Sequence, residues 1–166
     1  MSDDGVHLFL NPTAGRGRAG KRELRISELL QRCNRPVEVH LSRDVGDLEQ
    51  QVLSQVRAGA SRIVVAGGDG SVHEASNGIM RAGGRASLGV IPSGTGNDFA
   101  KACDVPLDWE LATTQLAERI EAGQAGRVID IGRMNGRYFA NGAGIGLDAR
   151  VTQIARSYRM PIGDLV

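Results

Sequence analysis

The sequence has few of the features that mark membrane-spanning, secreted or disulfide-rich proteins. Its two cysteines, Cys33 and Cys103, lie far apart and form no CxxC pair, so we expect reduced thiols rather than a disulfide or a metal site. Even the longest apolar runs are short, such as residues 63–66, and none is long enough to span a bilayer. The residues after Met1 are acidic rather than apolar, so no secretory signal is expected and a cytoplasmic location is predicted.

Aromatic residues make up only 4% of the chain, and the formal net charge is only +1. A nearly neutral chain has no overall attraction for nucleic acid, so no nucleic-acid partner is expected. The charge is uneven, however, because residues 16–25 hold five basic side chains and a single acid. This basic run is either a solvated helical turn or a surface for phosphate groups or an anionic membrane, and charge alone leaves these alternatives open.

Glycine, by contrast, is abundant, with 23 residues among 166. The glycines gather between apolar runs rather than in a flexible linker. The 41% of hydrophobic and 23% of charged residues are typical of a globular domain. The glycines therefore mark the turns that connect regular elements.

Apolar runs and helical periodicity alternate along the chain. Strands are expected at residues 6–10, 37–41, 62–66, 88–91 and 128–131, and helices at residues 26–33, 45–58, 72–82 and 109–120. Asn135 and Gly136 predict a tight hairpin from 128–131 into 138–140. This alternation predicts an α/β fold, an open and mostly parallel sheet flanked by helices.

Three glycine-rich loops follow expected strands, at residues 11–15, 67–71 and 92–99. In open parallel sheets, ligands bind at the carboxyl ends of the strands. Glycines let backbone N–H groups approach an anion, and a following helix adds its free N–H groups. A single such loop is most often only a structural turn. Three of them together favour a phosphate-binding site.

Two acids lie in these loops, Asp69 and Asp98. A carboxylate beside a phosphate is unfavourable unless a cation lies between them, so both indicate Mg²⁺. The structural alternative is that each acid caps a helix. Ser71, Ser93 and Thr95 are expected either to cap helices or to contact a phosphate oxygen.

Other chemistries lack their motifs. The chain contains no GxxxxGK[ST] loop and no GxSxG nucleophile turn. The histidines are isolated and lack metal-ligand spacing; His7 and His40 fall inside strands and are expected to be structural. His73 lies just past the second loop and is the stronger candidate of the three for a ligand contact.

Four blocks in order resemble the diacylglycerol kinase catalytic domain, which sphingosine kinases, ceramide kinases and bacterial YegS-like lipid kinases share. GGDGSVHEASNG at 67–78 resembles the signature GGDGT-x-x-E-x-x-N-G, and GVIPSGTGNDFA at 89–100 resembles G-x-x-P-x-GTGNDFA. NPTAG at 11–15 is similar to the opening N-P-x-[AS]-G. Residues 139–149 are similar to a later block, F-x-N-x-x-x-G-x-D-A. Ser71 replaces the commoner Thr and keeps its hydroxyl, and Ala75 stands where Val is frequent.

The resemblance implies an ATP-dependent lipid kinase, related in fold to NAD kinases and 6-phosphofructokinases. It assigns ATP contacts to Asn11, Gly67, Gly68, Asp69, Gly70, Ser71, Gly94, Thr95, Gly96 and Asn97. It assigns Mg²⁺ and the region between domains to Asp69, Asp98 and Asp130.

In the resembled family a second, β-sandwich domain binds the lipid and supplies the catalytic base. We therefore expect residues 1–150 to form the ATP-binding domain and 151–166 to begin the connection to that domain. The lipid and the base are expected outside these 166 residues, and the isolated piece is expected to be inactive. Self-association as a homodimer and peripheral contact with the anionic inner membrane surface stay open. The alternatives are a non-catalytic nucleotide-binding or dimerising module, or a related kinase with a non-lipid substrate.

Overall fold

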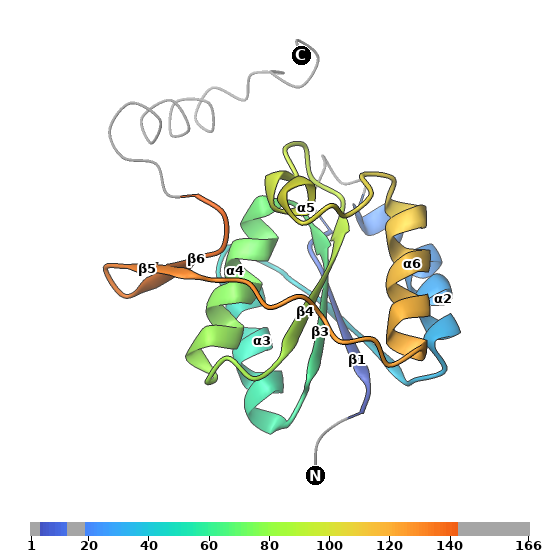
Figure 1. Ribbon diagram of the computed structural model, residues 1–166, viewed down its shortest axis with the longest axis horizontal. Helices are drawn as coiled ribbons and strands as arrows, with labels where there is room; N and C mark the ends of the chain where they lie inside the picture. The colour runs from blue at the N-terminus through green and yellow to red at the C-terminus, as the bar shows by residue number, and fades with distance from the viewer. Residues whose placement is uncertain (1–3, 13–18, 143–166) are drawn as a thin grey trace.

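In a computed structural model, which describes residues 4–12 and 19–142, a parallel sheet lies between two layers of helices (Figure 1). The sheet has the order β2-β1-β3-β4, and a separate hairpin follows it. The strands are β1 (Val6–Leu10), β2 (Val37–Leu41), β3 (Arg62–Gly67), β4 (Ser87–Pro92), β5 (Gly132–Met134) and β6 (Arg137–Phe139). The helices are α2 (Glu23–Leu30), the 3₁₀ turn η1 (Gln31–Cys33), α3 (Asp47–Ala58), α4 (Asp69–Arg81), α5 (Asp98–Ala102) and α6 (Trp109–Glu121).

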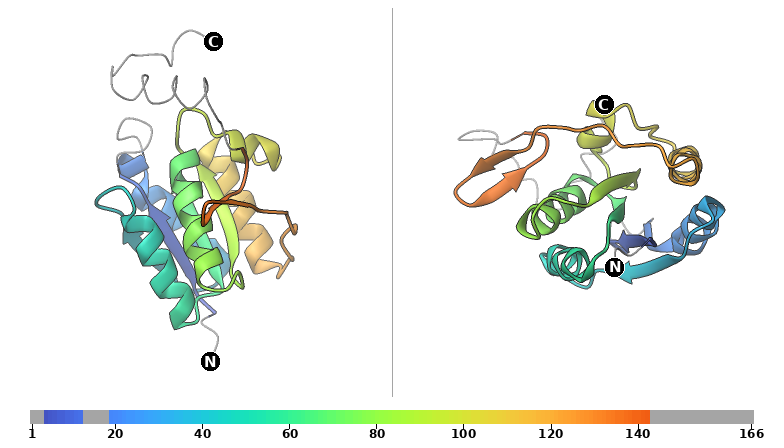
Figure 2. Two further views of the ribbon diagram at one scale, coloured as in Figure 1. Left: turned by 90° about the vertical axis from the view of Figure 1, so that its left-hand side faces the viewer. Right: turned by 60° about the horizontal axis from the view of Figure 1, so that its bottom comes forward.

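The two central strands are apolar on both faces because both faces are covered. Alternate residues of a strand point to opposite sides. Leu8 accordingly packs in the core beneath α2 and α6, whereas Phe9 packs with Leu48 and Val52 of α3 on the other side. Figure 2 shows the sheet with α2 and α6 on one side and α3 and α4 on the other. This two-sided burial is what the continuous apolar runs predict.

The direction in which successive strands are added to the sheet reverses between β1 and β3. From β1 the chain passes through α2 to the neighbouring edge strand β2, whereas from β3 it passes through α4 to β4 at the other edge. Right-handed crossovers therefore place α2 and α4 on opposite faces. The connections from β1 and β3 therefore lead to opposite faces of the sheet, and such a switch point is where open α/β sheets bind ligands.

Local signals set the helix ends as the sequence predicts. Helix α3 ends before Gly59, whose φ of 116° belongs to the left-handed region that glycine adopts without strain. Helix α6 begins after Asp108, whose carboxylate accepts hydrogen bonds from the N–H groups of Glu110 and Leu111.

The hairpin is confirmed, but its first strand is displaced from the prediction. Asn135 and Gly136 have φ angles of 49° and 79°, as a two-residue turn requires, and Met134 pairs with Arg137 across it. The prediction of a strand at 128–131 is wrong. This stretch is extended without strand pairing in the described structure, and it leaves Val128 95% exposed. An apolar run predicts a strand only when a partner edge is available.

Among the helices of the described residues, none has the length and apolar character needed to cross a bilayer. Cys33 is buried and Cys103 is half-buried, and both are free thiols.

Helix α4 offers a matched pair of glycines that tests the packing between α3 and α4. A Cβ on Gly78 would lie 2.8 Å from both the Glu49 carbonyl oxygen and Val52 Cβ, whereas a Cβ on Gly70 would meet nothing within 4 Å. Gly78→Ala should therefore cost about 1–3 kcal/mol of unfolding free energy through overpacking. Gly70→Ala should leave stability unchanged or raise it by up to about 1 kcal/mol. Urea unfolding of both variants checks this, and equal midpoints would contradict the close helix contact.

Candidate functional site

The three predicted loops begin at one edge of the sheet, because all four strands of the sheet run parallel. The backbone N–H of Asn11, just after β1, donates to the Ala66 carbonyl of β3 at 3.4 Å. The N–H of Ser93, just after β4, donates to the Gly67 carbonyl at 2.9 Å. These bonds tie the loop starts together at the carboxyl ends of β1, β3 and β4, beside the switch point.

The second and third loops touch through backbone alone, at Gly68 and Gly94. An ideal Cβ on Gly94 would lie only 2.5 Å from the Cα of Gly68 and 3.0 Å from Oδ1 of Asn97. A Cβ on Gly68 would lie 3.0 Å from the Cα of Gly94. A side chain at Gly94 would clash with the Gly68 backbone, and one at Gly68 would require the Gly94 backbone to give way. The two glycines therefore bring backbone groups close to each other and to any bound molecule.

Asn97 closes the third loop into a ring. Its Oδ1 accepts from the N–H of Gly94, and its Nδ2 donates to the Gly94 carbonyl, both at 3.0 Å. Its own φ of 54° lies in the left-handed region, which asparagine tolerates better than most residues. Asn97 therefore fixes the loop from inside; its side chain is committed to this role in the described structure.

Asp69 and Asp98 come together across the two loops. Oδ1 of Asp69 accepts the N–H of Phe99 at 3.0 Å, so Asp69 caps α5 rather than its own helix α4. A Cβ on Gly96 would lie 2.9 Å from Oδ2 of Asp69 and 3.4 Å from Oδ2 of Asp98. Each acid thus turns one carboxylate oxygen toward the exposed Gly96. Capping and cation binding, the two alternatives from the sequence, are compatible for Asp69 because it has two oxygens.

The three hydroxyl residues behave differently from one another. Ser93 is 3% exposed, and among the described residues its hydroxyl has no hydrogen-bond partner. Ser71 is buried in the first turn of α4, close enough to Gly67 to exclude a side chain there. Thr95 is exposed. Of the two alternatives for these residues, N-capping of α4 and α5 is not seen: the residues preceding these helices are Gly68 and Asn97, and neither helix has a cap bond from its own N-cap side chain. Contact with a phosphate oxygen stays a prediction.

Asp130 does not join Asp69 and Asp98 in a cluster of three metal ligands in the described part of the chain. It lies exposed on the extended segment between α6 and β5. The strand expected at 128–131, which would have contained Asp130, is not formed in the described structure.

The second half of the GGDG block supports the fold instead of facing the loops. Asn77 is fully buried in α4, and its side chain exchanges hydrogen bonds of 3.0 and 2.9 Å with the backbone N–H and C=O of Tyr138. Glu74 accepts the N–H of Glu49 at 3.3 Å, in the first turn of α3. No role was predicted for Glu74 and Asn77 from the sequence. Their places in the GGDG block were the only sequence signal that they matter.

Glu49 adds an ionic link between the same elements. Its carboxylate is 4% exposed and lies 2.5 Å from the guanidinium of Arg81 and 2.8 Å from that of Arg137. Burial acts to raise the pKa of Glu49, but hydrogen bonds from Arg137 and Arg81 outweigh burial and lower the pKa below its usual value. The β5–β6 hairpin is thereby attached to α3 and α4.

The described basic residues of the run at 16–25 mostly contact α6 and α2. The guanidinium of Arg22 lies over the Trp109 ring, 4.8 Å from its centroid. Arg25 pairs with Glu28 and Glu110 at 3.3 and 3.9 Å. Local pairing therefore accounts for these two cations. Arg16 and Arg18 lie outside the described residues.

With this geometry in place, the chain was compared with known proteins. Residues 5–133 match the family described as the diacylglycerol kinase catalytic domain. The chain belongs to this family. The match spans the loops after β1, β3 and β4 and the whole four-stranded sheet, and it confirms the resemblance noted in the sequence. Residues 13–15 of the first block and 143–149 of the last lie outside the described residues.

Relatives in the diacylglycerol kinase catalytic domain family are longer proteins. The chain is 36% identical over 153 residues to a probable YegS-like lipid kinase of Pseudomonas aeruginosa, covering 92% of this chain and 47% of that protein. It is 34% identical over 156 residues to a diacylglycerol kinase of Bacillus subtilis, covering 94% of this chain and 48% of that protein. The chain thus spans about half the length of the curated relatives it matches.

Solved structures agree with the fold. A diacylglycerol kinase from Bacillus anthracis superposes with a TM-score of 0.72 at 27% sequence identity, over 82% of this chain and 45% of that one. The predicted fold class, a parallel sheet flanked by helices, is therefore confirmed by the structure and by this member of the family.

Two substitutions of Asp69 separate its capping bond from its charge. Asp69→Ala removes the acceptor for the Phe99 N–H and should cost about 1 kcal/mol, as the loss of a helix cap does. Asp69→Asn keeps an acceptor oxygen and should unfold near the wild-type midpoint. Urea unfolding and hydrogen exchange at the Phe99 amide measure both effects. Equal protection of this amide in all three proteins would show that Asp69 does not cap α5.

Proposed function

We propose that this chain is the nucleotide-binding part of an ATP-dependent lipid kinase, which transfers the γ-phosphoryl group of ATP to a primary lipid hydroxyl. The observation that carries the proposal is the side-chain-free approach of Gly68 and Gly94 between two loops at the carboxyl ends of β3 and β4. Such a backbone surface suits the phosphate chain of a nucleotide, because amide N–H groups can approach it closely. The names of the relatives, diacylglycerol kinase and probable lipid kinase, support the choice of a lipid substrate.

The residues present fit a bound nucleotide. The buried Ser93 hydroxyl has no partner in the described structure and lies at the start of the third loop. A buried hydroxyl without a partner costs free energy, so a phosphate oxygen is a suitable acceptor for it. The loops at Asn11, Gly67 to Ser71 and Gly94 to Asn97 would then line the phosphate chain, as the resemblance implies.

The two acids fit a divalent cation. The free oxygens of Asp69 and Asp98 both lie beside Gly96, and hard carboxylate oxygens are the ligands that Mg²⁺ prefers. Mg²⁺ would offset the repulsion between these acids and the phosphates and neutralise charge that develops during transfer. We propose that Asp130 takes part in this region only when the part of the protein that follows it in sequence is in place.

The lipid and the acceptor of its hydroxyl proton are proposed to lie in the other half of the protein. Phosphoryl transfer forms a bond from the lipid oxygen to the γ-phosphorus. The bond between the γ-phosphorus and the oxygen that leaves with ADP breaks, while a base takes the hydroxyl proton. Support for a further covering structure comes from the segment before β5. Val128 is 95% exposed and Ile129 42% exposed there, and they line a groove of about 680 Å³ along β4 and α6. Apolar side chains so exposed favour a contact with more protein.

Calorimetry of Mg²⁺-ATP binding tests the site. Asp98→Asn, which has no capping role, should weaken binding by about tenfold or more, because a charged metal ligand becomes neutral. Asp69→Asn should have a similar effect while the fold is kept. Glu118→Gln, which removes an exposed carboxylate from α6, is the charge-matched control and should bind like the wild type. Wild-type affinity in both aspartate variants would exclude these acids from the metal site.

We further expect residues 1–166 alone to phosphorylate no lipid. The reason is that the proposed base and lipid pocket lie outside them. Radiolabelled ATP, incubated with the purified chain and diacylglycerol in mixed micelles, should give no labelled lipid above the background of the Asp98→Asn protein. Turnover well above that background would mean that a complete active site lies within these residues.

A further inference from the structure

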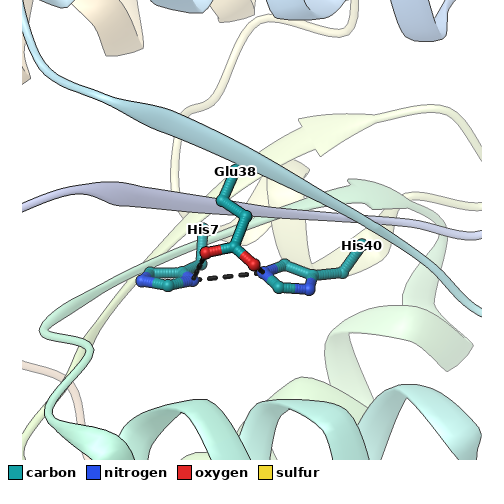
Figure 3. Close-up of side chains that lie close together, drawn as sticks. All are labelled: His7, Glu38 and His40. Carbon is teal, nitrogen blue, oxygen red and sulfur yellow. Dashed lines mark hydrogen bonds and ion pairs between the residues drawn. The ribbon is translucent and has the colours of Figure 1, made fainter.

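A second group of ligand-type side chains lies away from the loops, at His7, Glu38 and His40. It is the one group of three such residues in the described structure whose ligand atoms all lie within 4.8 Å of one another. Figure 3 shows the two imidazole rings edge to edge, with the Glu38 carboxylate spanning them. The histidines are thirty-three positions apart in the sequence, which is why no metal-ligand spacing was visible.

The sheet itself brings these residues together. Strands β1 and β2 pair in parallel with His7 beside Glu38 and Phe9 beside His40. Residues two apart on a strand share a face, so one side chain from β1 and two from β2 point to the same side. His7 is 3% exposed, and the His40 ring stacks on Phe9 at a centroid distance of 4.6 Å. The two imidazoles are therefore held in place by the backbone ladder and the core.

The ligand atoms lie near the spacing of a tetrahedral metal site. Nδ1 of His7 lies 3.1 Å from Nε2 of His40; Oε2 of Glu38 lies 3.7 Å from the first nitrogen, and its other oxygen, Oε1, lies 3.6 Å from the second. Zinc bonds of about 2.0–2.2 Å in tetrahedral geometry separate neighbouring ligand atoms by roughly 3.3–3.6 Å. Rotation of the exposed Glu38 side chain and a small separation of the two imidazoles would bring one atom of each residue onto a shared ion.

We propose that His7, Glu38 and His40 bind a divalent transition-metal ion, with Zn²⁺ as the ion that two imidazole nitrogens and one carboxylate suit best. Nitrogen ligands select ions such as Zn²⁺ over Mg²⁺, which prefers oxygen. The Glu38 side chain is 63% exposed, which gives an ion a route from solvent and leaves room for a water ligand. The ion would link the edge strand β2 to β1.

This site is separate from the loops that are proposed to hold nucleotide. His7 is the second residue of β1, and Asn11 follows the end of that strand about 13 Å further along it. The metal would therefore act on the stability of the sheet edge. An ion that binds only the folded chain stabilises it by mass action.

The competing interpretation is a histidine pair that shares one hydrogen bond and binds no ion. Titration of the untagged, chelator-stripped protein with Zn²⁺ against a chromogenic chelator distinguishes the two. It should be done in excess Mg²⁺, so that oxygen-only sites are occupied. We expect one equivalent of Zn²⁺ with a dissociation constant on the order of 1 μM or tighter, and a Tm that rises by several degrees.

Three variants assign the site. His40→Ala and Glu38→Gln should each weaken Zn²⁺ binding by about tenfold or more and abolish the rise in Tm. Both residues are more exposed than His7, so these proteins are expected to fold, which circular dichroism checks. His73→Ala removes the one histidine outside the cluster, which is exposed on α4, and should bind like the wild type. No stoichiometric binding by the wild type, unchanged binding by His40→Ala and Glu38→Gln, equal weakening by all three variants, or displacement of Zn²⁺ by Mg²⁺ would each overturn the proposal.

Discussion

The close approach of two glycine backbones, Gly68 and Gly94, is the contact on which the rest of the candidate site depends. It requires β3 and β4 to end level with each other, which the register of Gly67 beside Pro92 provides. It also requires the third loop to keep its shape without side chains at the contact. The Asn97 side chain stabilises that shape through its two hydrogen bonds to the Gly94 backbone. Once the two loops touch, Asp69 reaches across to α5. The acids and the backbone amides therefore occupy one place because no Cβ separates the loops.

The GGDG block serves both the site and the fold, and helical periodicity divides the two tasks. Its first residues form the turn and the first turn of α4, where side chains and amides face the loop edge. Further along the helix, Asn77 donates a hydrogen bond to the β6 backbone, and Gly78 lets α3 pack closely because it has no side chain. A substitution late in the block therefore acts on the hairpin and the α3–α4 packing, whereas one early in it acts on the loops. A single sequence motif thus combines residues with separate physical roles.

The sequence predicted the local elements and the site loops well, because strands, helix ends and the Asn135–Gly136 turn follow from short-range patterns. It could not predict contacts between distant segments. The cap that Asp69 forms on α5 joins residues thirty positions apart, and the link from Asn77 to Tyr138 joins residues sixty-one apart. The strand expected at 128–131 failed for the same reason, because pairing depends on a partner edge that periodicity does not reveal.

Parallel pairing also explains why one small sheet can carry two chemically different ligand groups. The carboxyl ends of β3 and β4 lead into loops with two acids, whose oxygens suit a hard cation beside phosphates. Within β1 and β2, the ladder instead aligns two imidazoles with a carboxylate, a set that suits a borderline ion. The two sets differ in ligand type and lie about the length of a strand apart, so neither of the two proposed ions would compete for the other's ligands. The sheet register, which no local sequence signal encodes, determines the second set entirely, whereas the first depends on loop sequence that can be read directly.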